Sequence, residues 1–360
     1  MIFIAGITIA ILIEFLLLSK KNKSESDKFL TLWMFLIVVH LFLFYTEFSG
    51  AAFEYPFLLG VSLPLPLLQA VFLYFYVGSL TNLLPKNRSI LLLHLLPAAI
   101  AYLYLISFFM LPSDEKIFVY ENQGAGYEIF LSLLNYATII SGIAYVTWSL
   151  LLLRRHRRNI LDKFSDVEKI NLRWLQILTW GMGGIWLIVI FEEGSIFTFS
   201  GVVIFVFLIA FFGIKQVRIF ASNEPAEVDA APPKGKYAKS GLNEALSSRL
   251  YEQLITRMNS EALYRNGDLS IGDLASQLDV HPNYLSQVIN EREGRNFYDF
   301  VNHYRVEEFK RLIADPKNHH LTLLSMAFDC GFNSKSAFNR YFKKNTGQTP
   351  SEYFSSVTKV

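Results

Sequence analysis

The chain of 360 residues is poor in cysteine and in charge. Its single cysteine, Cys330, excludes an intrachain disulfide and a metal site built from several cysteines. Charged residues make up 18% of the chain, whereas an ordinary soluble domain has about 25%. Apolar residues make up 52%, and this composition excludes a disordered, a collagen-like or a small disulfide-stapled chain. The formal net charge of +2 gives no indication of a nucleic-acid partner.

The chain also lacks the sequence patterns of the common catalytic classes. No kinase, nucleotide-binding or zinc-protease motif occurs in its apolar runs or in the loops between them. We therefore expect no catalytic residue, no cofactor and no metal site, and we do not expect an enzyme.

Charge divides the chain into two unequal parts. Residues 1–219 hold 16 Lys or Arg and 14 Asp or Glu, whereas the much shorter stretch 241–360 holds 14 of each. Residues 220–240 contain three prolines and no apolar run, so they cannot bury enough surface to offset the entropy of ordering. The sequence predicts an apolar region at 1–219, a flexible linker at 220–240 and a polar domain at 241–360.

Seven runs in the apolar region are long and apolar enough to cross a membrane as helices. A span needs about 20 such residues to cross about 30 Å of hydrocarbon. The third run contains Pro64 and Pro66, so we expect its outer end to be kinked or irregular. The predicted spans are Ile2–Leu18, Phe29–Phe48, Val61–Leu84, Leu91–Leu111, Ile129–Leu153, Trp174–Phe191 and Ile196–Ile214.

The loops between these runs predict the orientation of the chain in a membrane. Alternate loops carry thirteen Lys or Arg on one side and a single one, Lys116, on the other. Because the basic loops of membrane proteins face the cytoplasm, we expect the N-terminus to lie outside. The chain after Ile214 would then lie in the cytoplasm.

Three ionisable residues inside the apolar runs are candidates for sensing a signal. Glu14 lies in the first run, where an ionisable side chain is costly and suggests a function. Alternatively, it reaches the cytoplasmic lysines six to nine residues later in a purely structural role. His40 and His94 are the other candidates, and the alternative for both is a hydrogen-bonded position inside a helix bundle.

The polar domain predicts two helix-turn-helix units. The first, at about residues 268–291, begins with Ser270 and Asp273 as a capping box and has Pro282 in the first turn of its second helix. The second, at about 322–345, begins with Thr322 as N-cap and turns at Gly331, which tolerates the left-handed conformation. An amphipathic helix over 296–314 joins them, and its rigidity would allow two recognition helices to enter successive major grooves.

The second unit carries a family resemblance. From Gly331 to Tyr353 the chain reads GFNSKSAFNRYFKKNTGQTPSEY, which closely resembles the signature GFxSxSxFxRxFKxxxGxxPxxYR of AraC/XylS-type transcription regulators. Tyr341 is larger than the usual residue at its position, and Phe354 replaces the terminal arginine. The upstream segments LASQLDVHPNYLSQVIN and NFYDFVNHYRVEEFKRLI also fit the family, so the resemblance covers about residues 245–355. The apolar region resembles the seven-span input region of membrane-bound bacterial relatives.

The resemblance implies that exposed polar residues of both second helices contact DNA. Asn and Gln can pair with adenine in the major groove, and Arg or Lys with guanine. Lys343 and Lys344 are expected on phosphate, which positions the protein without specifying a sequence. The expected contacts in the first unit are Asn283, Ser286, Gln287 and Asn290, and those in the second unit are Lys335, Ser336, Asn339 and Arg340.

Together, these patterns predict an all-α protein of the bacterial inner membrane. A seven-helix transmembrane bundle would act as sensor or anchor, and a cytoplasmic domain with two helix-turn-helix units would regulate transcription. The expected partners are promoter double-stranded DNA, the lipid bilayer, RNA polymerase and an unknown small-molecule or membrane signal, and a homodimer is left open. Two alternatives also stay open: a transporter or membrane enzyme with an autoregulatory DNA-binding domain, and spans that serve only as an anchor.

Overall fold

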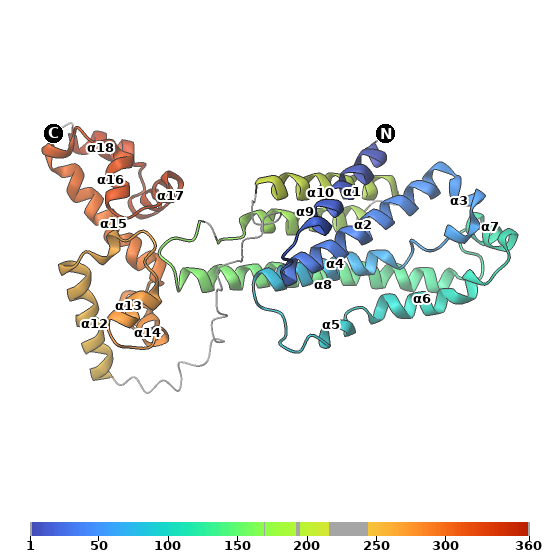
Figure 1. Cartoon of the computed structure of the whole chain (residues 1–360), viewed down its shortest axis with the longest axis horizontal. Helices are drawn as coiled ribbons and strands as arrows, with labels where there is room; N and C mark the ends of the chain where they lie inside the picture. Colours follow the sequence, from blue (N-terminus) through green and yellow to red (C-terminus); the bar gives the residue numbers. More distant parts are fainter. Residues whose placement is uncertain (1, 169, 192–194, 216–243, 359–360) are drawn as a thin grey trace. The chain divides into compact units, whose positions relative to one another are not determined.

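The computed structural model describes residues 2–168, 170–191, 195–215 and 244–358, and every regular element in them is a helix. The all-α prediction is thus confirmed for the described part of the chain. Two compact units are present (Figure 1). We call Met1–Arg154 with Leu172–Asp229 the apolar unit, and Arg155–Asn171 with Ala230–Val360 the C-terminal unit. The predicted linker at 220–240 lies outside the described residues.

Five helices in the described residues are long and apolar enough to cross a membrane. They are α1 (Ile2–Ser19), α2 (Glu25–Ser49), α8 (Glu128–Leu161), α9 (Arg173–Phe191) and Ile196–Gly213 of α10 (Ser195–Lys215). These helices coincide with five of the seven predicted spans.

The other two predicted spans are not single long helices. In place of Val61–Leu84 the chain forms α4 (Leu65–Leu80), a helix of 16 residues that begins between Pro64 and Pro66. The residues just before it form turns, in agreement with the irregular outer end that the sequence predicts. In place of Leu91–Leu111 it forms α5 (Ile90–Leu93) and α6 (Leu96–Phe109), because Pro97 in the first turn of α6 cannot continue a preceding helix. The remaining short helices of this unit are α3 (Ala51–Glu54), η1 (Pro56–Leu58) and α7 (Ser113–Glu121), which is bent from α6 by 118°.

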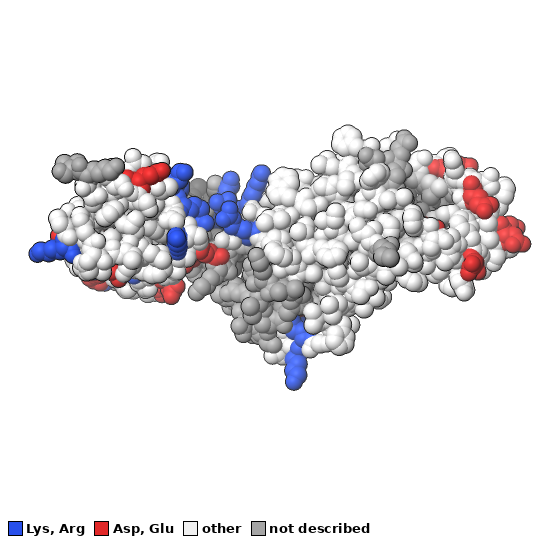
Figure 2. Space-filling model, turned by 90° about the horizontal axis from the view of Figure 1, so that it is seen from above, with Lys and Arg blue, Asp and Glu red and all other residues white. Residues whose placement is uncertain are grey.

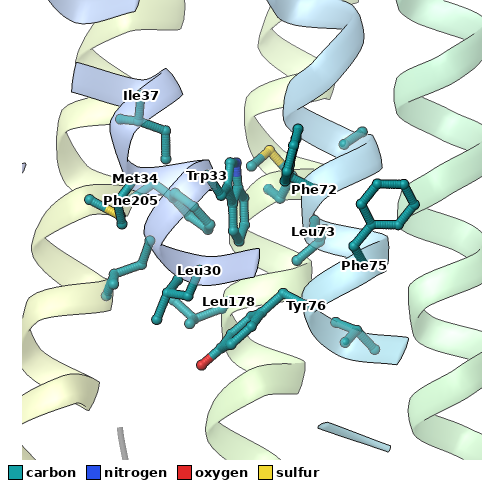
Figure 3. Packing of buried hydrophobic residues seen from close by; sticks show 14 of the residues in the cluster. Leu30, Trp33, Met34, Ile37, Phe72, Leu73, Phe75, Tyr76, Leu178 and Phe205 are labelled. Atoms are coloured by element: carbon teal, nitrogen blue, oxygen red, sulfur yellow. The ribbon is translucent and has the colours of Figure 1, made fainter. Parts of the chain in front are cut away.

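The core of the apolar unit is built around Trp33 of α2 (Figure 3). Its ring lies 5.7 Å from that of Phe205 of α10 and 6.4 Å from that of Tyr76 of α4, measured between ring centroids. Its indole N–H donates a hydrogen bond to Gln69 Oε1 at 3.0 Å, so the buried polar atom is satisfied. One side chain therefore ties together three helices that lie far apart in the sequence.

The surface of the apolar unit is itself apolar over a wide band. Large side chains such as Phe15, Leu103 and Ile129 are exposed. On the face shown in Figure 2 this band carries no charged side chain, and acidic side chains gather at one end of the unit. An exposed apolar surface of this extent indicates contact with lipid or with another apolar partner.

The C-terminal unit arranges its helices around a connecting helix, α15 (Phe297–Ala314). Before it come α12 (Glu244–Ser260), η3 (Leu263–Arg265), α13 (Ile271–Gln277) and α14 (Pro282–Glu293). After it come η4 (Pro316–Asn318), α16 (Leu323–Asp329), α17 (Lys335–Thr346) and α18 (Pro350–Thr358). The first half of α15 buries Phe297, Phe300 and Val301 among the apolar residues of α12, α13 and α14.

Candidate DNA-binding site

The first helix-turn-helix unit consists of α13 and α14. Ser270 and Asp273 form the predicted capping box, in which the Ser270 hydroxyl accepts from the Asp273 N–H at 3.2 Å. The turn passes through Asp279 at a φ of 52°, a left-handed conformation that aspartate tolerates. His281 then caps α14, because its Nδ1 accepts from the N–H of Asn283 at 3.2 Å. The sequence did not predict this histidine cap.

The expectation that all four candidate residues of α14 are exposed is wrong for two of them. Ser286 is 8% exposed and Gln287 is 9% exposed, whereas Asn290 is exposed and Asn283 is half-buried. Two hydrogen bonds along the helix involve these residues: Asn290 Nδ2 donates to the Ser286 backbone carbonyl at 2.7 Å, and Gln287 Nε2 donates to Glu291 Oε1 at 2.8 Å. Gln287 Oε1 is buried without a hydrogen-bond partner among the described residues.

The second unit consists of α16 and α17. Thr322 and Ser334 cap the two helices by accepting from the N–H groups of Ser325 and Ala337 at 3.1 Å each. Gly331 has a φ of 98°, and a Cβ there would lie 2.4 Å from the carbonyl oxygen of Tyr264, so only glycine fits this turn.

The six candidate residues of α17 are all exposed and lie along one face of the helix. They recur in adjacent pairs every four residues, which is the spacing of a single helical face. The opposite face buries Ala337, Phe338, Tyr341 and Phe342. The exposed residues are Lys335, Ser336, Asn339, Arg340, Lys343 and Lys344.

The connecting helix holds this second unit by both apolar and polar contacts. Phe309 of α15 lies 4.6 Å from Phe338 and 5.4 Å from Phe342, measured between ring centroids. The Tyr341 hydroxyl donates to the carbonyl of Asp299 at 2.7 Å, which gives the unusually large residue at this position a role in packing. Lys344 Nζ lies 2.8 Å from Asp299 Oδ1, so this lysine forms an ion pair within the protein.

A segment that the sequence did not assign to this domain lies on it. We call residues 162–168, which follow α8, the docking loop. Its backbone pairs with the entrance to α13: Ser165 N–H donates to Leu269 O at 3.1 Å, and Ile271 N–H donates to Lys163 O at 2.9 Å. Ser165 is buried, and its carbonyl accepts from Asn302 Nδ2 of α15 at 3.0 Å.

The docking loop also places a carboxylate on the recognition helix α17. Glu168 Oε1 accepts from the Ser336 hydroxyl at 2.7 Å and lies 3.4 Å from Arg340 Nη2, and Glu168 Oε2 accepts from the Ser334 hydroxyl. Burial acts to raise the pKa of the Glu168 carboxyl. The hydrogen bonds from Ser334 and Ser336 and the charge of Arg340 outweigh burial, so this pKa lies below its ordinary value.

Burial shifts the pKa values of two further groups in the C-terminal unit. Burial lowers the pKa of the Arg305 guanidinium to about 10, which leaves it charged at neutral pH. Burial raises the pKa of the Cys330 thiol to about 12, so the thiol is protonated and unreactive in the fold. Cys330 thus packs as an apolar residue.

The three candidate sensing residues lie in different surroundings in the apolar unit. Glu14 lines a surface pocket with Lys23 and Lys28, and its Oε2 is buried without a hydrogen-bond partner among the described residues. His94 Nδ1 lies 2.7 Å from the Tyr145 hydroxyl, which fits the structural alternative. His40 lines a pocket between the helices of this unit together with Trp186. The structure therefore does not bring the three together.

Comparison with known proteins identifies the type of the C-terminal domain. Residues 274–356 match the family model described as a helix-turn-helix domain, which is of the AraC type. The HTH-type transcriptional regulator YijO of Escherichia coli is 38% identical over 74 residues, which cover 21% of this chain and 25% of that protein. The HTH-type transcriptional regulator YobQ of Bacillus subtilis is 33% identical over 112 residues, or 31% of this chain and 44% of that protein.

The matched parts are thus less than half of these relatives' own length. A solved structure of a protein of unknown function from Listeria innocua covers 29% of this chain at 26% identity, with a TM-score of 0.26 that is too low to support a conclusion. Residues 274–356 thus match a helix-turn-helix domain of the AraC type, and both relatives are named as uncharacterized HTH-type transcriptional regulators.

Proposed function

We propose that the protein is a membrane-bound one-component transcription regulator that binds specific double-stranded DNA. The observation that carries this proposal is the exposed polar face of α17, with four basic side chains, in a domain of helix-turn-helix type. Arg340 and Asn339 would contact base edges, whereas Lys343 would contact phosphate. The connecting helix α15 would hold α14 at a fixed spacing from α17, so that both helices enter successive major grooves.

In the first unit, Asn283 and Asn290 would reach DNA directly. Ser286 and Gln287 could contact DNA only after their hydrogen bonds within the helix break. Gln287 Oε1, which has no partner among the described residues, would then gain a hydrogen bond from a base. RNA polymerase is the expected target of the bound protein, and a homodimer would bring two such domains to one promoter and raise avidity.

The apolar unit would be a sensor in the bacterial cytoplasmic membrane. The apolar band, the five long helices and the uneven distribution of basic loops support this. We propose seven spans, in which α4 and the pair α5 and α6 serve as the third and fourth, with the N-terminus outside and the C-terminal domain in the cytoplasm. An unknown small-molecule or membrane signal would set the output.

The experiment is a binding selection from random duplexes with the full-length protein in lipid nanodiscs. We expect extraction from bacterial membranes to require detergent, and we expect the selection to enrich one sequence pattern. A matched selection with an Asn339→Ala, Arg340→Ala variant should lose part of that pattern. Protein that stays in the aqueous phase without detergent would contradict the membrane assignment, and failure to enrich any sequence would contradict the regulatory one.

A further inference from the structure

The docking loop occupies part of the surface through which the proposed regulator would contact DNA. Glu168 accepts hydrogen bonds from Ser334 and Ser336 at the start of α17 and pairs with Arg340 in the second turn of this helix. Ser336 and Arg340 are two of the four residues expected to contact bases in this unit. The Ser336 hydroxyl donates its single proton to Glu168 and cannot donate it to a base at the same time, and the pairing of Arg340 with Glu168 draws this guanidinium toward a carboxylate instead of DNA.

The chemistry of the contact is that of an anion bound at the start of a helix. The N-terminal turn of a helix favours negative charge, because its free N–H groups and the helix dipole point toward it. Two hydroxyl donors and one guanidinium add charge-assisted hydrogen bonds, which are stronger than neutral ones. A DNA phosphate or a base acceptor would use the same donors, so Glu168 competes with DNA for them.

The loop is also held on the domain by several hydrogen bonds. Ser165 bonds to the backbone of Leu269 and to the side chains of Asn302 and Arg305, and it is buried at their centre. These contacts join the entrance of the first unit to the connecting helix. Glu168 is only three residues further along the chain, so the anchoring of Ser165 keeps its carboxylate close to α17.

We propose that the docking loop is an autoinhibitory segment, in which Glu168 blocks the recognition helix α17 until the loop is released. This inference rests on the proposed function and names its regulation. The loop lies in the segment of the chain between α8 and α9, two of the five helices that can cross a membrane. A signal that moves these helices would pull on the loop through the chain itself, without passing through residues 220–240.

The test measures affinity for the selected duplex with full-length protein in nanodiscs, comparing the wild type with Glu168→Ala. We expect the variant to bind tighter by about 5- to 150-fold, the usual range of a coupling between two sites. Glu252→Ala is the matched control, because it removes an exposed carboxylate from α12 and changes the net charge equally. It should change the affinity less than twofold.

Two further measurements separate the possible failures. Slow labelling of the buried Cys330 by a thiol reagent would show that the Glu168→Ala variant is folded. Equal affinity of the folded variant and the wild type would overturn the autoinhibitory role and leave the proposed function standing. Failure of wild type and variant to bind any duplex would overturn the proposed function, and the inference with it.

A separate observation concerns a partly open cavity between the helices of the apolar unit. It has a volume of about 330 Å³ and is lined by residues of α2, α8, α9 and α10 and by α4 with the turn before it. This lies within the range of about 300–1,000 Å³ of pockets that bind small molecules. No Asp, Glu, Lys or Arg lines it in the described residues, and its polar lining residues are His40, Gln69, Asn135, Thr138 and Thr198.

Two lining residues carry N–H groups that have no partner among the described residues. Gln69 Oε1 already accepts from Trp33, and its Nε2 is buried without an acceptor. Trp186 Nε1 is likewise buried without an acceptor. A buried polar group without a partner is costly, so a bound acceptor would stabilise the unit.

From these donors we infer that the cavity binds an uncharged, mostly apolar molecule with a hydrogen-bond acceptor such as an ester or ketone oxygen. Such an oxygen could belong to a membrane lipid or to a free small molecule. A charged ligand is disfavoured, because the lining offers it no opposite charge.

The test uses methyl decanoate as an ester probe and undecane as a probe without an acceptor. In ether-lipid nanodiscs, we expect methyl decanoate to raise the unfolding temperature of the full-length protein by about 2–4 °C. We expect undecane to leave this temperature unchanged. Gln69→Leu should abolish the shift, whereas the matched control Gln176→Leu, outside the lining, should keep it. If a lipid ester is the natural ligand, ester-lipid nanodiscs should give the same stabilisation without the probe. Equal responses of wild type and Gln69→Leu to every lipid and probe would overturn the inference.

Discussion

The guanidinium of Arg305 in α15 donates hydrogen bonds to both oxygens of Ser165 in the docking loop. Nη1 bonds to the carbonyl at 3.3 Å, and Nη2 bonds to the hydroxyl at 3.0 Å. The same side chain donates Nε to the carbonyl of Tyr264 at 2.7 Å and lies over the ring of Phe332 at 5.8 Å. It is 1% exposed, so one buried cation joins the docking loop, the entrance to the first unit and the turn of the second.

Replacing Arg305 by methionine should therefore destabilise the C-terminal unit. Several buried carbonyl oxygens lose their donor, at about 1–3 kcal/mol each, so we expect the free energy of unfolding to fall by about 3 kcal/mol. Denaturant unfolding of the full-length protein, followed by labelling of Cys330, measures it. Arg249→Met, an exposed position on α12, is the control and should cost little. A loss below about 1 kcal/mol for Arg305→Met would contradict this role.

Two basic residues on α17 should differ in what they contribute to DNA binding. Arg340→Ala should weaken binding to the selected duplex by about 1–3 kcal/mol and relax the choice of one base pair. Lys343→Ala should weaken binding to all sequences alike. It should also reduce the slope of log affinity against log salt concentration by about one. Salt titrations on selected and random duplexes measure both effects. If Arg340→Ala loses equal affinity for the two duplexes, Arg340 contacts phosphate and does not read a base.

Glu308 should stabilise the fold in a pH-dependent way. Its hydrogen bond from Arg311 lowers the pKa of the Glu308 carboxyl, burial opposes this, and Arg265 lowers the pKa further, to about 2. A carboxyl with a lowered pKa stabilises the fold above its ordinary value near 4.5, and the stabilisation is lost as pH falls toward 2.

Glu308→Gln should therefore lower the free energy of unfolding most at neutral pH. We expect about 1 kcal/mol, since both guanidiniums are more than half exposed and solvent screens them. The difference in unfolding free energy between wild type and variant should shrink between pH 5 and pH 2. A difference that stays constant over this range would show that the carboxylate charge is not the cause.

The single cysteine allows a simple test of the C-terminal core. With the pKa of its thiol raised to about 12 from 9.0, Cys330 has on the order of a thousandfold less thiolate than a free thiol at neutral pH. A maleimide should label the native protein very slowly and the denatured protein rapidly. Rapid labelling of the native protein would contradict the burial of this side chain.

Local patterns predicted much of the helix-turn-helix domain. The capping box of Ser270 and Asp273, the N-cap Thr322 and the left-handed Gly331 are set by neighbouring residues, and the structure has all three. Helix ends depend on hydrogen bonds within three or four residues, so short motifs carry this information.

Longer-range features could not be predicted in the same way. The contact of Ser165 with Arg305 joins residues 140 positions apart, and no periodicity in the docking loop indicates it. Ser286 and Gln287 are buried although the helical pattern placed them on an exposed face, and the bond of Gln287 Nε2 to Glu291 is a choice that this pattern leaves open. In the apolar region, composition predicted the long helices, but the break between α5 and α6 depends on Pro97 inside an otherwise continuous apolar run.

The most direct test of the central claim is hydroxyl-radical footprinting of the selected duplex with the full-length protein in nanodiscs. Two recognition helices in one rigid domain predict two protected patches on one face of the DNA, about 10 base pairs apart from centre to centre. The Asn339→Ala, Arg340→Ala variant should lose one patch and keep the other. A single patch, or protection that does not depend on the sequence, would contradict the claim.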